Sequence, residues 1–392
     1  MSGEMVLTNA RIVLDDQILH GSVLIRDGVI ADISPQSSTS TSGVDVDGDY
    51  LMPGVVEVHT DHLEYHFTPR PGVFWDPLPA VLAHDAQMAA AGATTVLDAV
   101  RIGSESESAD TTAAAAHRLA DAVTQAVDAG LLRADHAIHL RCEVSAADCV
   151  DAFQEFADDP HVRLASLMDH APGQRQFADI EQFKKYYGGK RQISPEDMDS
   201  YIAERVEQSE RHADLNRKTI ATLATERGIT LAAHDDATPA HVEESIGLGV
   251  HIAEFPTTIA AAESATHHGL QVVMGAPNIA RGGSQSGNVA ATDLLERGFL
   301  HILSSDYVPA SPLQAVFQLA ADGALDLVEG AKLISGNPAR AIGFDDRGEI
   351  AVHKRADLVR VRSHTMPPTP RHPRGLDVPV VRGVYRAGTR VT

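Results

Sequence analysis

The sequence has very little cysteine: Cys142 and Cys149 are the two cysteines among 392 residues. Two are too few for the disulfide framework of a small secreted domain, and they fit a reducing cytosol. No apolar run approaches the ~18 residues that a membrane-spanning helix needs. Residues 1–9 also lack the basic segment and apolar core of a secretory signal. We therefore expect a cytoplasmic protein that does not span a membrane.

Positive charge is also scarce, because 32 Lys and Arg stand against 54 Asp and Glu, which gives a formal net charge of -22. Such an excess of negative charge repels nucleic acid and anionic membranes, so we expect neither as a partner. A small anionic substrate is still allowed, since a local basic pocket can override the average charge. The sequence leaves the oligomeric state open and is compatible with a homo-oligomer.

The order of apolar segments predicts an α/β fold, a (β/α)8 TIM-like barrel with a small β-sandwich domain built from both termini. Short alternating strands fill residues 1–54 and return over residues 345–392, where Glu349–Val352, Asp357–Val361 and Val378–Arg382 are expected strands. Residues 55–344 alternate strands with helices, which matches a barrel of about 250 residues or more. The eight expected barrel strands are Val55–His59, Thr94–Val100, Ala137–Val144, Val162–Asp169, Ile229–His234, Val250–Glu254, Leu270–Gly275 and His301–Asp306.

The barrel has a surplus segment around residues 171–194, between the fourth and fifth strands. It is polar and basic, with Arg175, Lys184, Lys185, Lys190 and Arg191. A long connection at this position of a barrel is usually a lid or substrate loop, although a solvated, inert surface is the alternative.

Carboxylate and imidazole groups collect where the barrel strands end. His59 and Asp61 are two residues apart, so they emerge on the same face of one strand. The carboxyl ends of the other strands meet at the same rim of a barrel, where its reacting groups lie. One buried polar group at a strand end is usually a satisfied core residue, but six such ends are costly to bury unless cations offset them. The predicted metal ligands are His59, Asp61, Glu143, His170, His234 and Asp306.

The ligand set predicts two divalent metal ions rather than one. Mixed nitrogen and oxygen ligands suit zinc first, with iron or manganese as alternatives. Five or six ligands exceed one tetrahedral zinc, and paired metals about 3.5–4 Å apart lower the pKa of water between them. Asp306 on the last strand is then the expected catalytic group that takes the proton of this water.

Three loops predict a polyphosphate substrate beside these metals. Each places an arginine next to glycine or proline after a barrel strand, at Arg70, Arg175 and Arg281. Arginine forms bidentate bonds with phosphate, and glycine lets backbone N–H groups approach it. Any one of them alone could be a surface arginine near a turn. The predicted substrate-binding residues are Arg70, Arg175, Arg281, Gly282, Gly283 and Ser284.

These residues together resemble the amidohydrolase superfamily, whose marks include Pro53-Gly54, Asp306, Ser335–Ala339 and Ala356–Val359. Within it, the chain is similar to the α-D-ribose 1-methylphosphonate 5-triphosphate diphosphatase family of the carbon–phosphorus lyase pathway. The similarity rests on His59–Asp61, Thr68–Pro71, Thr94–Val100, His139–Glu143, Ser166–Phe177, Ala233–Thr238, Ala253–Thr258, Met274–Asn278, Arg281–Ser284 and Ser304–Tyr307.

The resemblance implies a metal-dependent hydrolase in which water attacks the α-phosphorus of a ribosyl 5-triphosphate. Pyrophosphate leaves, and 5-phosphoribosyl 1-methylphosphonate remains. The resemblance places metal ligands at His59, Asp61, Glu143, His234 and Asp306, with His170 and Glu254 at neighbouring strand ends.

One departure from the family pattern follows the His59–Asp61 triplet. The family pattern predicts Asn at the next position, but this chain has His62, followed by Glu64 and His66. Extra imidazoles there can alter the choice of metal or the accepted substrate. The alternative functions are a C–N hydrolase, such as a deaminase, lactamase or deacetylase, and a barrel that serves only in assembly. The arginine loops argue against the first, and the filled ligand positions against the second.

Overall fold

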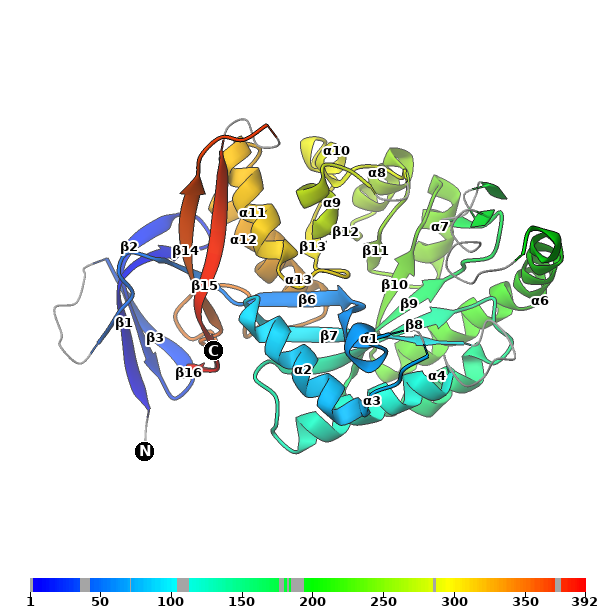
Figure 1. Ribbon diagram of the computed structural model, residues 1–392, viewed down its shortest axis with the longest axis horizontal. Coiled ribbons are helices and arrows are strands. Elements are labelled where there is room, and N and C mark those ends of the chain that lie inside the picture. Colours follow the sequence, from blue (N-terminus) through cyan, green and yellow to red (C-terminus); the bar gives the residue numbers. More distant parts are fainter. Residues whose placement is uncertain are drawn as a thin grey trace.

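The computed structural model describes residues 3–35, 43–70, 72–103, 113–175, 180–181, 183–184, 194–284, 287–370 and 375–392. Two units are visible in Figure 1, a barrel and a smaller sheet beside it that contains the strands nearest to both termini. The chain passes from the sheet to the barrel at Gly54, between β5 (Tyr50–Pro53) and β6 (Val55–Thr60). The barrel strands therefore begin near the small sheet, and their carboxyl ends point away from it.

The barrel is a single parallel sheet of eight strands in the order β6 to β13. Its two edges meet at the rim, where Asp306 N donates to His59 O at 3.1 Å and Asp61 N donates to Asp306 O at 3.0 Å. Each of the eight expected strands overlaps an observed one, so the predicted (β/α)8 architecture is confirmed. The remaining barrel strands are β7 (Ala93–Ile102), β8 (Asp135–Glu143), β9 (Val162–Met168), β10 (Thr230–His234), β11 (Ile252–Glu254), β12 (Gln271–Gly275) and β13 (Ile302–Ser304).

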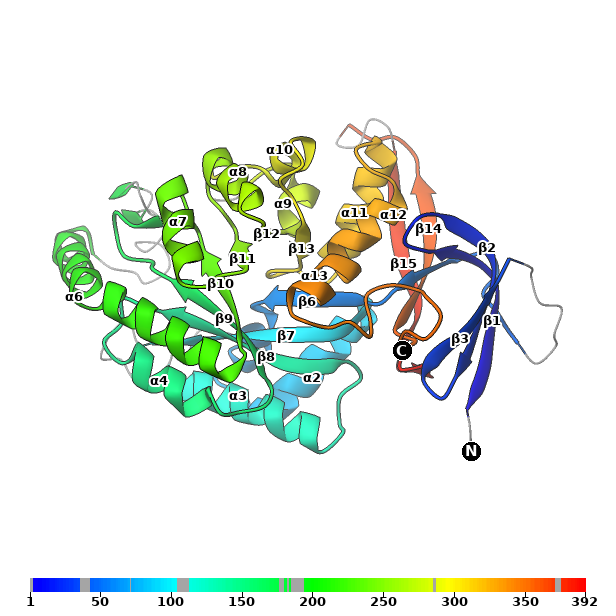
Figure 2. The same cartoon turned by 180° about the vertical axis from the view of Figure 1, so that it is seen from behind.

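Helices cover the outside of the barrel, as the two opposite views in Figures 1 and 2 show. Several begin at side-chain caps that the sequence contains. Ser194 accepts from Asp197 N ahead of α6, and Thr238 accepts from His241 N ahead of α7. The helices are α1 (His62–Phe67), α2 (Pro77–Ala90), α3 (Ala113–Asp128), α4 (Cys149–Phe156), α6 (Pro195–Arg227), α7 (Pro239–Gly247), α8 (Ile259–His267), α9 (Ala276–Arg281), α10 (Ala291–Glu296), α11 (Ser311–Asp322), α12 (Leu327–Ala331), η2 (Lys332–Gly336) and α13 (Asn337–Ala341).

The longest helix, α6, has 33 residues and is strongly polar. Within the described part of the chain, no helix combines the length and apolar character needed to cross a membrane. Most of the expected lid at 171–194 lies outside the described residues. Of the part that is described, Phe183 is fully buried and packs against Met198 on α6.

The strands of the small domain form one curled sheet around their own apolar core. Its order is β16-β15-β14-β5-β1-β2-β3, with β4 beside β1. The curl brings the β2–β3 turn against the β15–β16 turn, where a Cβ added to Gly28 would lie 3.0 Å from Ala387 O. These strands are β1 (Glu4–Val13), β2 (Ile18–Arg26), β3 (Val29–Ser34), β4 (Val44–Asp45), β14 (Leu358–Met366), β15 (Leu376–Arg386) and β16 (Thr389–Arg390).

The strand expected at Glu349–Val352 is wrong. His353 turns the chain with a left-handed φ of 72°. The segment therefore meets β3 only at its end, where His353 N donates to Ile30 O at 2.8 Å and Ile30 N donates to Lys354 O at 2.8 Å. The turn replaces the ladder that an extended strand would form.

An ion-pair group joins the small domain to the barrel at the start of β8. Asp135 contacts Arg347 at 2.9 Å and Arg386 at 3.3 Å, and it also pairs with Arg355. Three guanidinium groups from the carboxyl-terminal segment thus meet one barrel carboxylate.

Candidate active site

A bulge in β6 places His59 inside the barrel. Between Glu57 and Thr60, β6 contains one residue more than the paired stretch of β7. Val56 and Val58 face the barrel interior below the rim, in the same apolar cluster as Leu97. Because of the extra residue, His59 also turns inward, at the rim. Bulges re-aim side chains in this way next to active sites.

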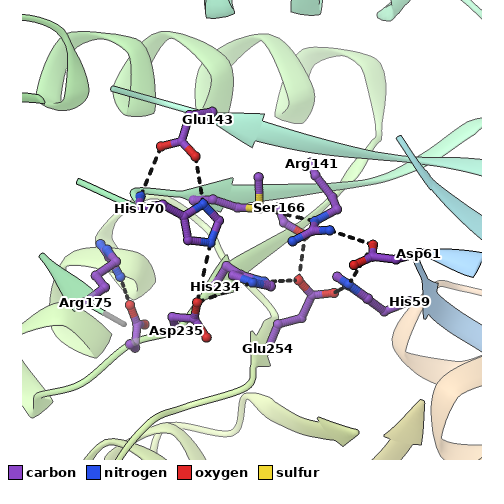
Figure 3. Close-up of polar contacts among 12 residues, drawn as sticks. His59, Asp61, Arg141, Glu143, Ser166, His170, Arg175, His234, Asp235 and Glu254 are labelled. Atoms are coloured by element: carbon purple, nitrogen blue, oxygen red, sulfur yellow. Dashed lines mark hydrogen bonds and ion pairs between the residues drawn. The ribbon is translucent and has the colours of Figure 1, made fainter. Parts of the chain in front are cut away.

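Glu254 on β11 holds two of the predicted ligands. His59 Nδ1 lies 3.0 Å from Glu254 Oε1, and His234 Nδ1 lies 3.0 Å from Glu254 Oε2 (Figure 3). Ser166 Oγ donates to the same carboxylate at 2.7 Å. Burial alone would raise the pKa of Glu254, but the neighbouring histidines lower it well below its ordinary range. An ionised Glu254 accepts both Nδ1–H groups, which leaves each Nε2 free to face the cavity.

His170, His234 and Asp235 form one group that could hold a metal ion. Asp235 Oδ2 lies 3.4 Å from His234 Nε2 and 3.7 Å from His170 Nε2. This buried oxygen has no hydrogen-bond partner among the described residues. A buried carboxylate oxygen without a partner, next to two imidazole nitrogens, fits a divalent cation.

His59, Asp61 and Asp306 form a second group with the same capability. His59 Nε2 lies 3.6 Å from Asp61 Oδ1, and Arg141 donates to the same oxygen at 2.5 Å. Burial and the nearby charge of Asp61 raise the pKa of Asp306 to about 6. Two adjacent groups of nitrogen and oxygen donors therefore fit a pair of divalent metal ions.

The backbone at three strand ends is held in an uncommon conformation. Asp235, Phe255 and Asp306 have left-handed φ values of 60°, 51° and 52°. Each N–H donates to the neighbouring strand, at Glu254 O, Val273 O and His59 O respectively. Such backbone strain concentrates at functional sites, and here it directs two carboxylates into the rim.

The structure brings His59, Asp61, His170, His234 and Asp306 together on the wall of one cavity of about 240 Å³. Glu143 lies behind this wall instead. Its carboxylate accepts from the His170 ring at 2.7 Å, from Ser145 Oγ at 2.8 Å and from Arg101 at 2.7 Å. In this geometry Glu143 orients His170 rather than reaching the cavity.

The predicted phosphate-binding residues separate into two sets. Arg281, Gly283 and Ser284 line the cavity, and Gly282 ends α9 beside them with a left-handed φ of 78°. Arg175 is 5% exposed and pairs with Asp236 and, at 2.9 Å, with Glu244. Arg175 and the exposed Arg70 are not among the lining residues.

Several residues of the site were not predicted from the sequence. Asp235 directly follows the expected strand Ile229–His234 and was not among the predicted ligands, although its position beside His234 carried that signal. Arg101 and Arg141 line the cavity from β7 and β8. Each lies an even number of positions after an inward-facing residue of the same strand, His139 on β8 and Leu97 on β7, and this spacing was the signal that could have identified them.

Comparison with known proteins gives the chain relatives over nearly its whole length. A model of the amidohydrolase family matches residues 143–392. The alpha-D-ribose 1-methylphosphonate 5-triphosphate diphosphatase of Escherichia coli (strain K12) is 45% identical over 357 residues, which cover 91% of this chain and 94% of that protein. The L-hydantoinase of Paenarthrobacter aurescens is 32% identical over 73 residues, 18% of this chain and 16% of that one.

Solved structures share the fold at low sequence identity. The dihydropyrimidinase of Brevibacillus agri matches with a TM-score of 0.63 and 13% identity, covering 99% of this chain and 95% of that chain. The N-acetyl-D-glucosamine-6-phosphate deacetylase of Mycobacterium smegmatis matches with a TM-score of 0.60 and 18% identity, covering 99% of this chain and 100% of that chain. The chain therefore belongs to the amidohydrolase family, and within it to the group that contains the ribose 1-methylphosphonate 5-triphosphate diphosphatase of Escherichia coli.

Proposed function

We propose that this protein hydrolyses α-D-ribose 1-methylphosphonate 5-triphosphate to 5-phosphoribosyl 1-methylphosphonate and pyrophosphate, in the cytoplasm. The observation that carries the proposal is one cavity in which two groups of metal-binding side chains lie beside Arg281, Gly283 and Ser284. The relative that is 45% identical has this activity in its name. The cavity thus combines the groups needed to activate water with groups that bind phosphate oxygens.

We assign the metal positions to two divalent ions, zinc first, with iron or manganese as alternatives. His59, Asp61 and Asp306 would hold one ion, and His170, His234 and Asp235 the other. Bound there, the ions would lower the pKa of a water molecule and offset the negative charge of the triphosphate. The donor set supports this assignment because it mixes neutral imidazole with carboxylate oxygen.

The protein's own side chains would position the reactants and move the proton. Asp306 has a raised pKa and lies at the rim between β13 and β6, so its carboxylate would accept the proton of the attacking water. Arg281, whose NH1 donates to Tyr307 Oη at 3.2 Å, would bind the terminal phosphates with the N–H groups around Gly283. Arg101 would be a further cation on the cavity wall.

The bond changes balance as a hydrolysis at the α-phosphorus. The water oxygen bonds to the α-phosphorus, the bond from that phosphorus to the α–β bridging oxygen breaks, and pyrophosphate leaves with that oxygen. The carbon–phosphorus bond of the methylphosphonate stays intact.

The test is phosphorus NMR of the reaction in ¹⁸O-labelled water. We expect pyrophosphate as the released species, with one ¹⁸O in the ribosyl 5-phosphate and none in pyrophosphate. Label in pyrophosphate would mean attack at the β-phosphorus, and orthophosphate as the only released species would contradict the proposal. Hydantoin, dihydrouracil and N-acetylglucosamine 6-phosphate serve as C–N substrates, for which we expect no turnover.

A further inference from the structure

A second group of histidines lies outside the cavity. His62 and His66 stand four residues apart on α1, so they share one face of that helix. His84 is fully buried on α2, which contacts α1 (Figure 1). The three rings each offer one nitrogen, and these atoms all lie within 4.8 Å of one another. None of the three lines the cavity described above.

The barrel strands separate this group from the catalytic rim. On β7, Leu97 faces the barrel interior, whereas Val96 and Val100 belong to the core beneath the helices. Alternation along the strand therefore points Asp98 toward the helices. Asp98 meets His84 there, on the opposite face of the sheet from His59 and His234.

A fixed carboxylate orients His84. Its Nε2 lies 2.8 Å from Asp98 Oδ1, and His136 Nδ1 lies 2.7 Å from Asp98 Oδ2. Burial would raise the pKa of Asp98, but His136 and His84 lower it below its ordinary range, so the ionised carboxylate accepts a hydrogen bond from His84 Nε2–H. His84 Nδ1 is then a lone-pair donor, and it faces His62 Nδ1 at 3.5 Å. A carboxylate that fixes the ring of a ligating histidine is a recurrent feature of zinc sites.

His66 shows that hydrogen bonding alone leaves the group incomplete. A hydrogen bond between His62 and His84 would occupy those two rings. His66 Nε2, however, is buried and makes no hydrogen bond to a described residue, although the Gln87 side chain interacts with this histidine. A cation held by all three rings would give this nitrogen a partner.

We propose that His62, His66 and His84 bind a zinc ion that is separate from the catalytic metals. Three neutral imidazoles suit zinc, with the fourth position open to water. His62 and His66 are half-buried and Tyr65 between them is 60% exposed, so an ion can enter from the surface. The ion would join α1, which begins directly after Asp61 and places Glu64 on the cavity wall, to α2.

The experiment compares zinc content after equilibration with micromolar zinc and gel filtration. The variants are His62→Asn, His66→Gln and the control His212→Gln, which removes a half-buried histidine of α6. We expect His62→Asn and His66→Gln each to hold one zinc per chain less than wild type, and His212→Gln to match wild type. The zinc X-ray absorption spectrum of wild type, after subtraction of the spectrum of each variant, should show nitrogen ligands of the imidazole type.

A barrel variant separates this proposal from the catalytic metals. His234→Asn should lose zinc from the rim, and adding His66→Gln should remove one zinc more. If His234→Asn keeps all its zinc, the assignment of the rim fails while the new site stands. Equal zinc in wild type, His62→Asn and His66→Gln, or binding by wild type only above millimolar zinc, would overturn the new site.

Discussion

Replacing Glu254 by Gln should weaken zinc binding at the rim without disrupting the fold. In the native site, Oε1 accepts from His59 Nδ1, and Oε2 accepts from His234 Nδ1 and Ser166 Oγ. A glutamine amide keeps one accepting oxygen and presents an N–H₂ donor at the other position. One histidine then faces a donor and must rotate or change its tautomer.

The size of the effect follows from the bond that is lost. A hydrogen bond to a charged group contributes about 1.5–3 kcal/mol, which corresponds to a roughly 10- to 150-fold change in affinity. Loss of such orienting partners typically lowers metal affinity or activity about 10- to 100-fold. We expect zinc affinity to fall within this range in Glu254→Gln, measured by competition with a chelator of known affinity. Pyrophosphate release at limiting zinc should fall in parallel.

A matched control is Glu244→Gln, because Glu244 pairs with Arg175 at 2.9 Å and Arg217 at 3.0 Å and does not line the cavity. This variant should bind zinc as wild type does. If Glu254→Gln binds zinc within about twofold of wild type while its fold is retained, Glu254 does not orient the two histidines as described.

Three further predictions concern the proton acceptor, the arginines and the domain contact. Asp306→Asn should lower kcat by about 10²–10⁴ with an unchanged circular dichroism spectrum, because the proton acceptor is lost; substantial residual turnover would exclude that role. Arg281→Ala should raise KM about tenfold or more, whereas Arg175→Ala should lower Tm instead, since its partners are Asp236 and Glu244. Asp135→Asn should reduce the free energy of unfolding by about 1–2 kcal/mol at pH 7 in denaturant titrations. Burial would raise the pKa of Asp135, but the arginines that contact it lower the pKa overall. The stabilisation that ionised Asp135 provides is therefore complete above the unfolded pKa of about 3.9. It disappears as the pH falls through the lower pKa of the folded protein, so the free energies of unfolding of wild type and variant should become equal in acid.

The barrel and most of the side chains that meet at its rim were predictable because both depend on local patterns. Apolar segments of strand length alternate with capped helices, and parallel strands bring their carboxyl ends to one rim. Reading the last residues of each strand therefore identified His59, His170, His234 and Asp306 as neighbours. The bulge between Glu57 and Thr60 was not predictable, because it depends on pairing with β7 rather than on a sequence signal in β6.

The exchange of roles between Glu143 and Asp235 has a physical explanation of the same kind. Glu143 ends a barrel strand and Asp235 directly follows one, so the sequence alone does not show which carboxylate faces the cavity. Glu143 is held by Arg101, Ser145 and His170, which satisfy its oxygens away from the cavity. Asp235 has a left-handed backbone and a buried oxygen with no partner among the described residues. Partners from distant segments, rather than strand position, decide which carboxylate is available to a cation.

The same reasoning separates two arginines that look alike in the sequence. Arg175 and Arg281 both follow a barrel strand and lie near glycines in the sequence, yet of these two only Arg281 lies on the cavity wall. Asp236 and Glu244 follow the next strand and hold Arg175 in a buried pair, at a sequence separation of 69 residues for Glu244. To bind a phosphate, Arg175 would have to leave both carboxylates, and removing a charged partner from a buried pair is costly. Its contribution is therefore to fix the loop after β9 against α7, and the phosphate recognition that we propose rests on the cavity-lining segment around Arg281.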